Sequence, residues 1–214
     1  MKKADIAVID YGMGNLRSVS KALEHVAPNK TVVVTSDPEV IQMAERVVFP
    51  GQGAMPDCIR ELDARGLRGA VMQATQQKPF LGICIGLQML FERSEEGNAE
   101  GLALLAGHVK RFTPQDMHDA QGAKLKVPHM GWSRVTQTKP HAMWHQIADG
   151  ERFYYVHSYY VVPAQAALEV GYTEYPKPFT CAIAQENLFA VQFHPEKSAQ
   201  AGLQLLRNFV NWQP

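Results

Sequence analysis

The first half of the chain alternates short runs of apolar, β-branched residues with amphipathic segments. These runs are predicted strands, and in chain order they are Ile6–Asp10, Thr31–Thr35, Arg46–Phe49 and Pro79–Ile83. Apolar residues between the first two runs recur at spacings of three and four, as on one face of a helix; they are Leu16, Val19, Leu23 and Val26. Apolar strands that alternate with helices predict a parallel sheet buried on both faces.

Two further helical stretches belong to this half. Helical patterns fill residues 55–77 with a break near Gly66, and a helix is predicted from about Gly86 to Ser94, after the fourth strand. Together with the alternation of strands and helices, they indicate an α/β fold.

The second half has a different pattern, because strands follow one another with few helices between them. The predicted strands are Val127–Trp132, Phe153–Val162, Leu168–Tyr172, Cys181–Ala184 and Phe189–Phe193. Residues 185–187 predict a hairpin turn, and a helix from about Ala199 to Val210 closes the chain. The predicted fold is therefore α/β, with a largely parallel central sheet flanked by helices and an antiparallel β extension, in a single domain over residues 1–214.

Composition and charge narrow the class of protein. The 214 residues are 46% hydrophobic and 20% charged, which is ordinary for a soluble protein. Lys and Arg together number 21, as do Asp and Glu, so no whole-molecule field favours nucleic acid or an anionic membrane. Neither partner is predicted.

The N-terminal stretch and the cysteines predict a cytoplasmic, reduced protein. The start, MKKADIAVIDYG, has only a short apolar run, unlike a signal peptide, and no stretch reaches transmembrane length. Cys58, Cys84 and Cys181 are an odd set without CxxC spacing, which argues against a disulfide framework or a zinc site. One of the three is then available as a working thiol.

Cys84 stands in the setting of a nucleophile. Residues 78–88 read KPFLGICIGLQ, which is a strand, then Gly82-Ile83-Cys84-Ile85-Gly86, then a helix. This is the G-x-nucleophile-x-G elbow with cysteine in place of serine, and small neighbours let the backbone approach closely at the turn. The alternative is that Cys84 is a small buried apolar residue. Cys58 and Cys181 lack such a setting and are predicted to be packing residues.

His194 is the strongest candidate for the base that a thiol nucleophile needs. Residues 190–198 read AVQFHPEKS, so His194 ends a strand and Glu196 follows two residues later, on the same side of an extended backbone. The carboxylate would orient the imidazole as the third member of a triad does. Alternatively, this is an ordinary surface His-Pro-Glu. His141 and His145 have zinc-like spacing but lack a third ligand, so no metal site is predicted.

These motifs resemble the class I (triad) glutamine amidotransferases, whose signature is a G-x-C-x-G elbow followed far downstream by H-P-E. The resemblance runs through nearly the whole chain, over IDYGMGNLRSV, PGQGAM, GICIGLQMLFERSEEG, PHMGW, YYVHSYY and VQFHPEKS. It implies a flavodoxin-like fold and the hydrolysis of L-glutamine to glutamate and ammonia by Cys84, His194 and Glu196, without a cofactor.

The resemblance also implies the remaining site residues. Backbone N–H groups of an oxyanion hole would come from Ile85, after the nucleophile, and from the Gly51-Gln52-Gly53 loop, where Gln52 departs from the commoner PGVG motif. Because the expected contact there is made by the backbone, the departure does not affect the contact itself. It bears on a peptide flip of the loop, which its glycines would permit, and on the regulation of that flip. The implied substrate-binding residues are Gln88, Glu96, His157, Ser158 and Tyr159. By itself, however, PGQG also reads as a plain turn, Glu96 as an acidic helix end and YYVHSYY as an aromatic strand.

The implied partner is a (β/α)₈-barrel cyclase, because IDYGMGN and PHMGW match the members of the family that serve histidine biosynthesis. The two subunits would form a heterodimer, and ammonia would pass to the cyclase, which makes imidazole glycerol phosphate and an aminoimidazole carboxamide ribotide. Candidate interface residues are Asn15, Arg17 and Trp132. Two alternatives remain open: another cysteine hydrolase or a glutaminase serving a different synthase, and a non-catalytic subunit that binds glutamine as a regulatory scaffold.

Overall fold

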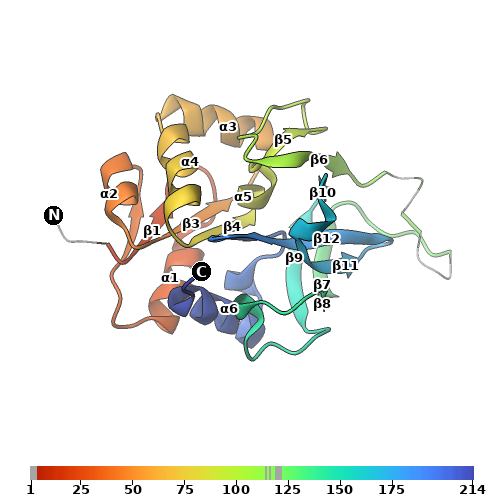
Figure 1. The fold of residues 1–214 in the computed structure, drawn as a ribbon. Coiled ribbons are helices and arrows are strands. Elements are labelled where there is room, and N and C mark those ends of the chain that lie inside the picture. Colours follow the sequence, from red (N-terminus) through yellow and green to blue (C-terminus); the bar gives the residue numbers. More distant parts are fainter. Residues whose placement is uncertain (1–3, 114, 116, 119–121) are drawn as a thin grey trace.

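The computed structural model describes residues 4–113, 115, 117–118 and 122–214. In this described part, eleven strands form one mixed sheet, whose main path runs β2-β1-β3-β4-β13-β12-β10-β6-β5 (Figure 1). The first five strands of this path pair in parallel: β2 (Val32–Thr35), β1 (Ile6–Ile9), β3 (Arg46–Gly51), β4 (Phe80–Cys84) and β13 (Leu188–Val191). Every residue of β1, β4 and β13 is buried, which confirms the predicted parallel sheet covered on both faces.

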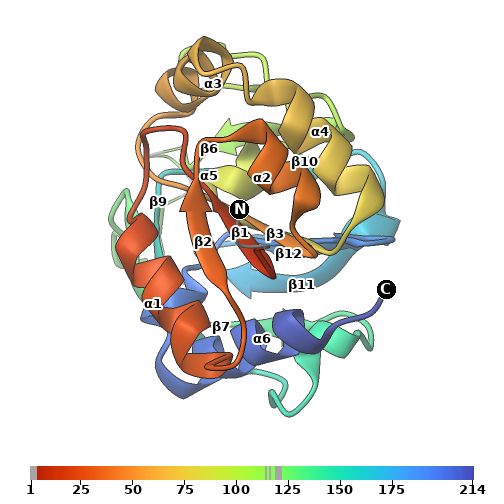
Figure 2. The same ribbon diagram turned by 90° about the vertical axis from the view of Figure 1, so that its left-hand side faces the viewer.

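Helices cover the two faces of the parallel part. In Figure 1, α3 (Met55–Ala64) and α4 (Arg68–Gln77) lie above the sheet, while α1 (Leu16–Val26) and α6 (Ala199–Asn211) lie below it, and Figure 2 shows the same layers from the side. The short α2 (Pro38–Met43) packs against α4. The predicted break between α3 and α4 is confirmed at Gly66, whose φ of +67° suits glycine.

Beyond β13 the sheet becomes largely antiparallel, as predicted. β12 (Pro178–Gln185) pairs antiparallel with β13, β10 and β11, and the predicted hairpin turn joins β12 to β13. The other strands of the extension are β10 (Tyr159–Pro163), β6 (Leu105–Arg111), β5 (Phe91–Ser94), β11 (Glu169–Glu174) and β8 (Thr136–Gln137). The extension also includes a separate antiparallel sheet of two strands, β7 (His129–Arg134) and β9 (Arg152–His157). Single turns of 3-10 helix span Ala142–Trp144, Ala166–Leu168 and Pro195–Lys197.

The helix predicted from Gly86 to Ser94 is wrong beyond its first turn. The helix α5 spans only Ile85–Gln88, and the chain then enters β5 at Phe91. Residues 81–91 are all buried, so no polar face marks a helical period and the apolar run fits a strand equally well. β5 pairs in parallel with β6, a strand that was not predicted.

The single strand predicted over residues 153–162 is two strands that divide at Ser158. β9 pairs with β7 in the small sheet, whereas β10 continues into the main sheet against β6 and β12. The backbone of Ser158 is held at the junction, because its carbonyl accepts a hydrogen bond from Phe112 N–H at 3.0 Å. Ser158 thus belongs to neither strand, and its carbonyl is bonded to the residue that follows β6.

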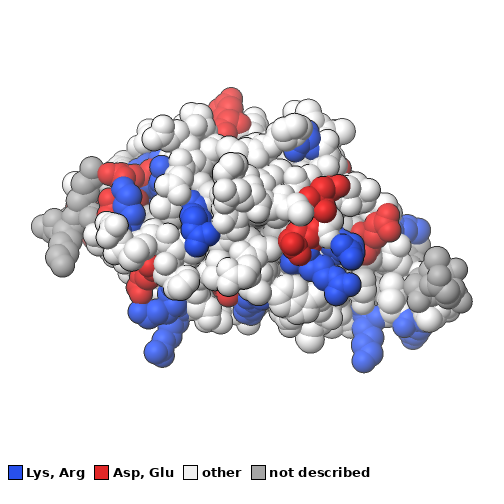
Figure 3. Space-filling view, turned by 90° about the horizontal axis from the view of Figure 1, so that it is seen from below, with Lys and Arg blue, Asp and Glu red and all other residues white. Residues whose placement is uncertain are grey.

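Charges are mingled on the face seen from below. Lys and Arg alternate with Asp and Glu there, and much of this face carries neither (Figure 3). Within the described residues, no helix has the length and hydrophobicity needed to cross a bilayer.

Candidate active site

A cavity of about 240 Å³ lies at the carboxyl end of β4, where open α/β sheets bind ligands. Most of the predicted site residues line it: Gln52, Gly53, Cys84, Ile85, Gln88, Glu96, His157, Ser158, Tyr159 and His194. Its volume is slightly below the ~300 Å³ at which pockets for drug-sized ligands begin. It therefore suits a ligand of amino-acid size.

Cys84 is the last residue of β4 and sits in a strained turn. Its φ is +55° and its ψ is −108°, a conformation that costs a non-glycine residue ~1–3 kcal/mol and persists only where the surroundings impose it. The side chain lines the cavity and is 4% exposed. This is the geometry of the predicted elbow.

The two glycines of the elbow are required by close packing. A Cβ on Gly86 would overlap the carbonyl oxygen of Phe49 in β3, and a Cβ on Gly82 would lie 2.9 Å from the Cβ of Ala190 in β13. Both neighbouring strands thus press against the turn at positions where only glycine fits. The sequence G-x-C-x-G folds this way because β4 is packed between β3 and β13.

His194 and Glu196 form a buried pair on the segment that follows β13. His194 Nδ1 lies 2.8 Å from Glu196 Oε1, and the two side chains are 5% and 2% exposed. Nε2 of His194 has no hydrogen-bond partner among the described residues. The imidazole therefore offers Nε2 to the cavity while Nδ1 is occupied by the carboxylate.

The electrostatics of His194 favour its charged form. Burial opposes the positive charge and lowers the pKa of His194, but the Cys84 thiolate and the Glu196 carboxylate outweigh it and raise that pKa to about 10. A thiolate beside an imidazolium is the reactive state of a cysteine nucleophile. Cys58 and Cys181 differ, because burial raises the pKa of Cys58 to about 11 and that of Cys181 to about 12. Both are buried in the core, as predicted.

The backbone of His194 is fixed from two sides. Its N–H donates to Tyr154 O at 2.9 Å, and its carbonyl accepts from Ser198 Oγ at 2.6 Å. Ser198 Oγ in turn accepts from Tyr154 N–H at 2.9 Å. The serine of the HPEKS stretch thus ties the histidine to β9.

The Gly51-Gln52-Gly53 loop lies beside the elbow. Gly51 pairs with Cys84 in the sheet, and a Cβ there would overlap Tyr11 Oη and lie 2.8 Å from Ile85 Cβ. The carbonyl of Gln52 accepts a hydrogen bond from Cys58 Sγ at 3.6 Å. The loop is thus within reach of a ligand at Cys84, although Gly51 itself does not line the cavity.

Two of the predicted substrate-binding side chains, Gln88 and Glu96, line the same cavity as Cys84. Gln88 is fully buried in α5, with its Nε2 bonded to Tyr159 O at 3.0 Å and its Oε1 without a partner among the described residues. Glu96 accepts a hydrogen bond from Met55 N–H at 2.7 Å, at the start of α3. An unpaired amide oxygen and a carboxylate at one cavity are suited to bind the N–H groups of a ligand.

The His157–Tyr159 segment is fixed by two histidines in series. His157 Nδ1 lies 2.8 Å from Tyr159 O, His157 Nε2 lies 3.0 Å from His129 Nδ1, and His129 Nε2 lies 2.8 Å from Ser133 Oγ. Since a carbonyl only accepts, His157 donates from Nδ1, His129 donates from Nδ1 and Ser133 donates its hydroxyl proton. Burial lowers the pKa of His157 to about 3 and that of His129 to about 4, so both stay neutral.

The predicted interface residues do not line this cavity. Asn15 caps the N-terminus of α1 and accepts from Ser18 N–H at 3.4 Å, and Arg17 is exposed two residues further on. Trp132 is 49% exposed on β7, next but one to Met130, which is 62% exposed. The neighbours Pro128 and Val156 line the cavity.

Three residues that contact the site were not predicted from the sequence. Gln192 Nε2 lies 3.6 Å from Cys84 Sγ, Tyr11 packs against Gly51, and His129 supports His157. Gln192 precedes His194 by two residues, and period-two spacing is the signal that could have found it. The contacts of Tyr11 and His129 are between distant segments and leave no local signal.

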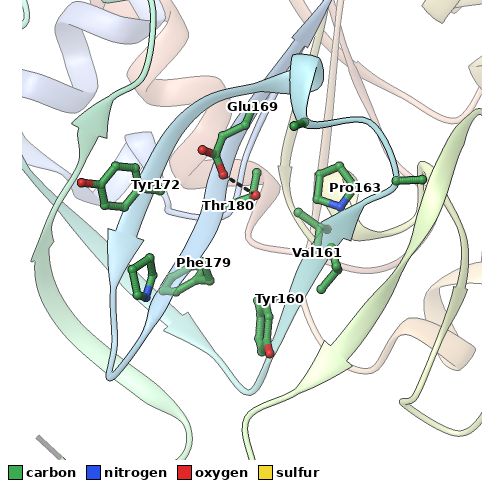
Figure 4. Close-up of a pocket in the computed structure, with 11 residues that line it drawn as sticks. Tyr160, Val161, Pro163, Glu169, Tyr172, Phe179 and Thr180 are labelled. Atoms are coloured by element: carbon green, nitrogen blue, oxygen red, sulfur yellow. Dashed lines mark hydrogen bonds between the residues drawn. The ribbon is translucent and has the colours of Figure 1, made fainter.

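A larger cavity of about 440 Å³ lies on the antiparallel extension (Figure 4). Glu169 and Thr180 point toward each other there, and Thr180 Oγ1 donates to Glu169 Oε2 at 2.6 Å. No cysteine or histidine is among the residues that line it, so it lacks the cysteine and histidine that meet at the first cavity. Throughout the described residues, no group of three or more His, Cys, Asp or Glu could hold a metal ion.

Comparisons with known proteins agree with this geometry. A family model described as glutamine amidotransferase class-I matches residues 7–212. The chain is 69% identical to the imidazole glycerol phosphate synthase subunit HisH of Dechloromonas aromatica, over 98% of this chain and 97% of that one. It is 65% identical to the protein of the same name from Aromatoleum aromaticum, over 99% of this chain and 100% of that one.

Solved structures show the same fold. A crystal structure of a putative GMP synthase subunit from Thermoplasma acidophilum superposes with a TM-score of 0.71 at 16% identity, over 99% of this chain and 94% of that one. A structure described as a glutamine amidotransferase gives 0.71 at 15% identity, over 97% and 98% of the two chains. With a family model that matches almost the entire chain, the protein belongs to the class-I glutamine amidotransferases.

Proposed function

We propose that this chain is the glutaminase subunit of an imidazole glycerol phosphate synthase. It would hydrolyse L-glutamine with Cys84, His194 and Glu196 and pass the ammonia to a barrel cyclase subunit in a cytoplasmic heterodimer. One observation carries the proposal: a strained cysteine and a buried histidine–glutamate pair meet at one cavity. The name shared by the relatives, imidazole glycerol phosphate synthase subunit HisH, supports the identity of the complex.

In the first half of the reaction, the Cys84 thiolate adds to the side-chain amide carbon of glutamine. The carbonyl electron pair moves to oxygen, and backbone N–H groups of Ile85 and the residue 51–53 loop stabilise the oxyanion. A single such donor is typically worth about 10²–10³ in rate. His194 then gives its Nε2 proton to the amide nitrogen, the C–N bond breaks, and ammonia leaves a γ-glutamyl thioester.

In the second half, neutral His194 accepts a proton from water as the hydroxyl adds to the thioester carbon. The C–S bond breaks, the thiolate is regenerated beside the imidazolium, and the new carboxylic acid loses its proton to solvent. Glu196 keeps Nδ1 protonated and stabilises the imidazolium, as the third member of a triad does. The cycle returns His194 and Cys84 to their starting charges.

Glutamine would be held by groups on three walls. Glu96 would bind the α-amino group, the unpaired Oε1 of Gln88 would accept an N–H, and backbone groups of residues 157–159 would bind the amino-acid end. Free ammonia in the cytosol mostly becomes ammonium, which is a poor nucleophile, and this favours release of the ammonia to a docked acceptor. Asn15, Arg17 and Trp132 are the proposed contacts to the cyclase, which makes imidazole glycerol phosphate and an aminoimidazole carboxamide ribotide.

The test is the Cys84→Ala variant in complex with the cyclase. Glutamine-dependent synthesis is expected to disappear, while synthesis from added ammonium salt continues at nearly the wild-type rate. Cys181→Ala is the matched control, because that thiol is buried in β12, and it is expected to retain glutamine-dependent synthesis. Glutaminase turnover by Cys84→Ala would refute the mechanism. Stimulation of the wild-type chain by a different synthase, and not by the cyclase, would refute the assigned partner.

A further inference from the structure

Gln192 is a buried polar side chain in contact with the nucleophile. It follows β13, is 0% exposed, and its backbone N–H donates to Cys181 O at 2.8 Å. Its side-chain Nε2 lies 3.6 Å from Cys84 Sγ, and its Oε1 accepts from Gln88 Nε2 at 3.1 Å. The amide thus bridges the nucleophile and a residue of the proposed glutamine site.

The direction of this amide is set by a backbone carbonyl. Tyr159 O can only accept, so Gln88 must point its NH₂ group toward it, at 3.0 Å. The second N–H of Gln88 then points to Gln192, which must present its oxygen there. If the Gln192 amide were reversed, its NH₂ would oppose that of Gln88, and its carbonyl would face the sulfur.

We propose that Gln192 is a further catalytic residue of the proposed glutaminase, one that donates an N–H to the Cys84 sulfur. Hydrogen bonds to a charged acceptor are roughly twice as strong as neutral ones, so this bond favours the thiolate over the thiol. It acts when the sulfur is charged, before attack and again as the thioester breaks. It also holds the sulfur on the cavity side of the elbow.

The titratable groups around the sulfur are not themselves replaced in a Gln192 variant. Tyr11, Cys58 and His194 each interact electrostatically with Cys84, from the end of β1, from α3 and from the segment after β13. Glu96 and His157 line the same cavity. A change in thiol reactivity on replacing Gln192 therefore reports the lost donor.

The test measures how fast iodoacetamide alkylates Cys84 across the pH range, by mass spectrometry of the Cys84 peptide. Gln192→Met keeps the length of the side chain and removes the donor. We expect the midpoint of the alkylation profile to rise by about one pH unit, which is about a tenfold decrease in the ionisation constant of the thiol. Gln192→Glu puts a carboxylate beside the sulfur and is expected to move the midpoint further.

Asn208→Asp is the matched control, because it replaces another buried amide, whose Nδ2 donates to the carbonyls of Met143 and His145. It is expected to lower the melting temperature but to leave the alkylation profile of Cys84 unchanged. An unchanged midpoint in a folded Gln192→Met or Gln192→Glu protein would overturn the inference. This measurement needs no glutamine turnover, so a negative result would contradict only the role of Gln192. The proposed function itself would be contradicted by a different result, namely a wild-type complex that releases no ammonia from glutamine.

Discussion

The parallel part of the sheet and the antiparallel extension build the two sides of the cavity by different means. In the parallel part, contacts with the Phe49 carbonyl and the Ala190 Cβ force the turn at Cys84, and only glycine fits beside it. In the extension, a chain of hydrogen bonds through His129 and His157 holds the Tyr159 carbonyl. The nucleophile is thus positioned by sterics, and the opposite wall by neutral polar side chains.

This contrast has consequences that can be measured separately. Close packing is sensitive to added volume and indifferent to pH, because no charge is involved. A buried histidine chain is sensitive to acid, because each imidazole must stay neutral to accept its hydrogen bond. Substitutions in the two regions should therefore fail in different experiments.

The largest expected effect is that of Gly86→Ala in the parallel part. The added methyl would overlap the Phe49 carbonyl oxygen, which is backbone and cannot rotate away, so we expect the free energy of unfolding to fall by more than ~3 kcal/mol. Gly69→Ala is the control, since Gly69 lies in α4 and a Cβ added there meets nothing within 4 Å. That variant should gain ~0.5–1 kcal/mol. Urea unfolding of both proteins measures these changes. Equal losses of unfolding free energy in the two variants would show that the elbow is not sterically forced.

The second effect is a loss of stability in mild acid that originates in the extension. The unfolded chain takes up a proton at each histidine near pH 6.5, whereas burial lowers the pKa of His129 to about 4 and that of His157 to about 3 in the folded chain. The free energy of unfolding therefore decreases as the pH is lowered from 6.5 to about 4. The decrease is ~1.4 kcal/mol per pH unit for each of the two histidines. Burial lowers the pKa of His141 too, with the same sign. The raised pKa of His194 acts in a separate window, where stability is lost as pH rises toward about 10.

Urea unfolding at intervals from pH 4.5 to 7 measures this slope. In His129→Asn the free energy of unfolding should depend less steeply on pH. The contribution of one histidine is lost, because the replaced side chain no longer titrates. His25→Asn, at an exposed position on α1, should leave it unchanged. A wild-type chain equally stable at pH 5 and pH 7 would contradict the neutral histidine chain.

The same contrast explains what the sequence could predict. Three parts of the site were predictable because local spacing puts their residues at strand ends. They are the elbow, the Gly51-Gln52-Gly53 loop and the His194–Glu196 pair. The helix beyond Gln88 was predicted wrongly because residues 81–91 are buried on every side and carry no period. The break at Ser158 was missed because it depends on pairing with β7, β6 and β12, which are distant in sequence.

The smallest effect on the chain itself is expected for Trp132→Ala, at an exposed apolar position of the extension. The indole is 49% exposed and its ring meets Tyr154 edge-on at 6.0 Å, so the free energy of unfolding should change by no more than ~0.5 kcal/mol. Affinity for the cyclase should nevertheless fall about tenfold or more, since buried Trp side chains dominate many interfaces. Met43→Ala, at a 59% exposed position of the parallel part, should change neither quantity. If both variants bound the cyclase as tightly as the unaltered chain in calorimetric titration, the exposed side of β7 would not be the docking face, and the extension would contribute only the cavity wall.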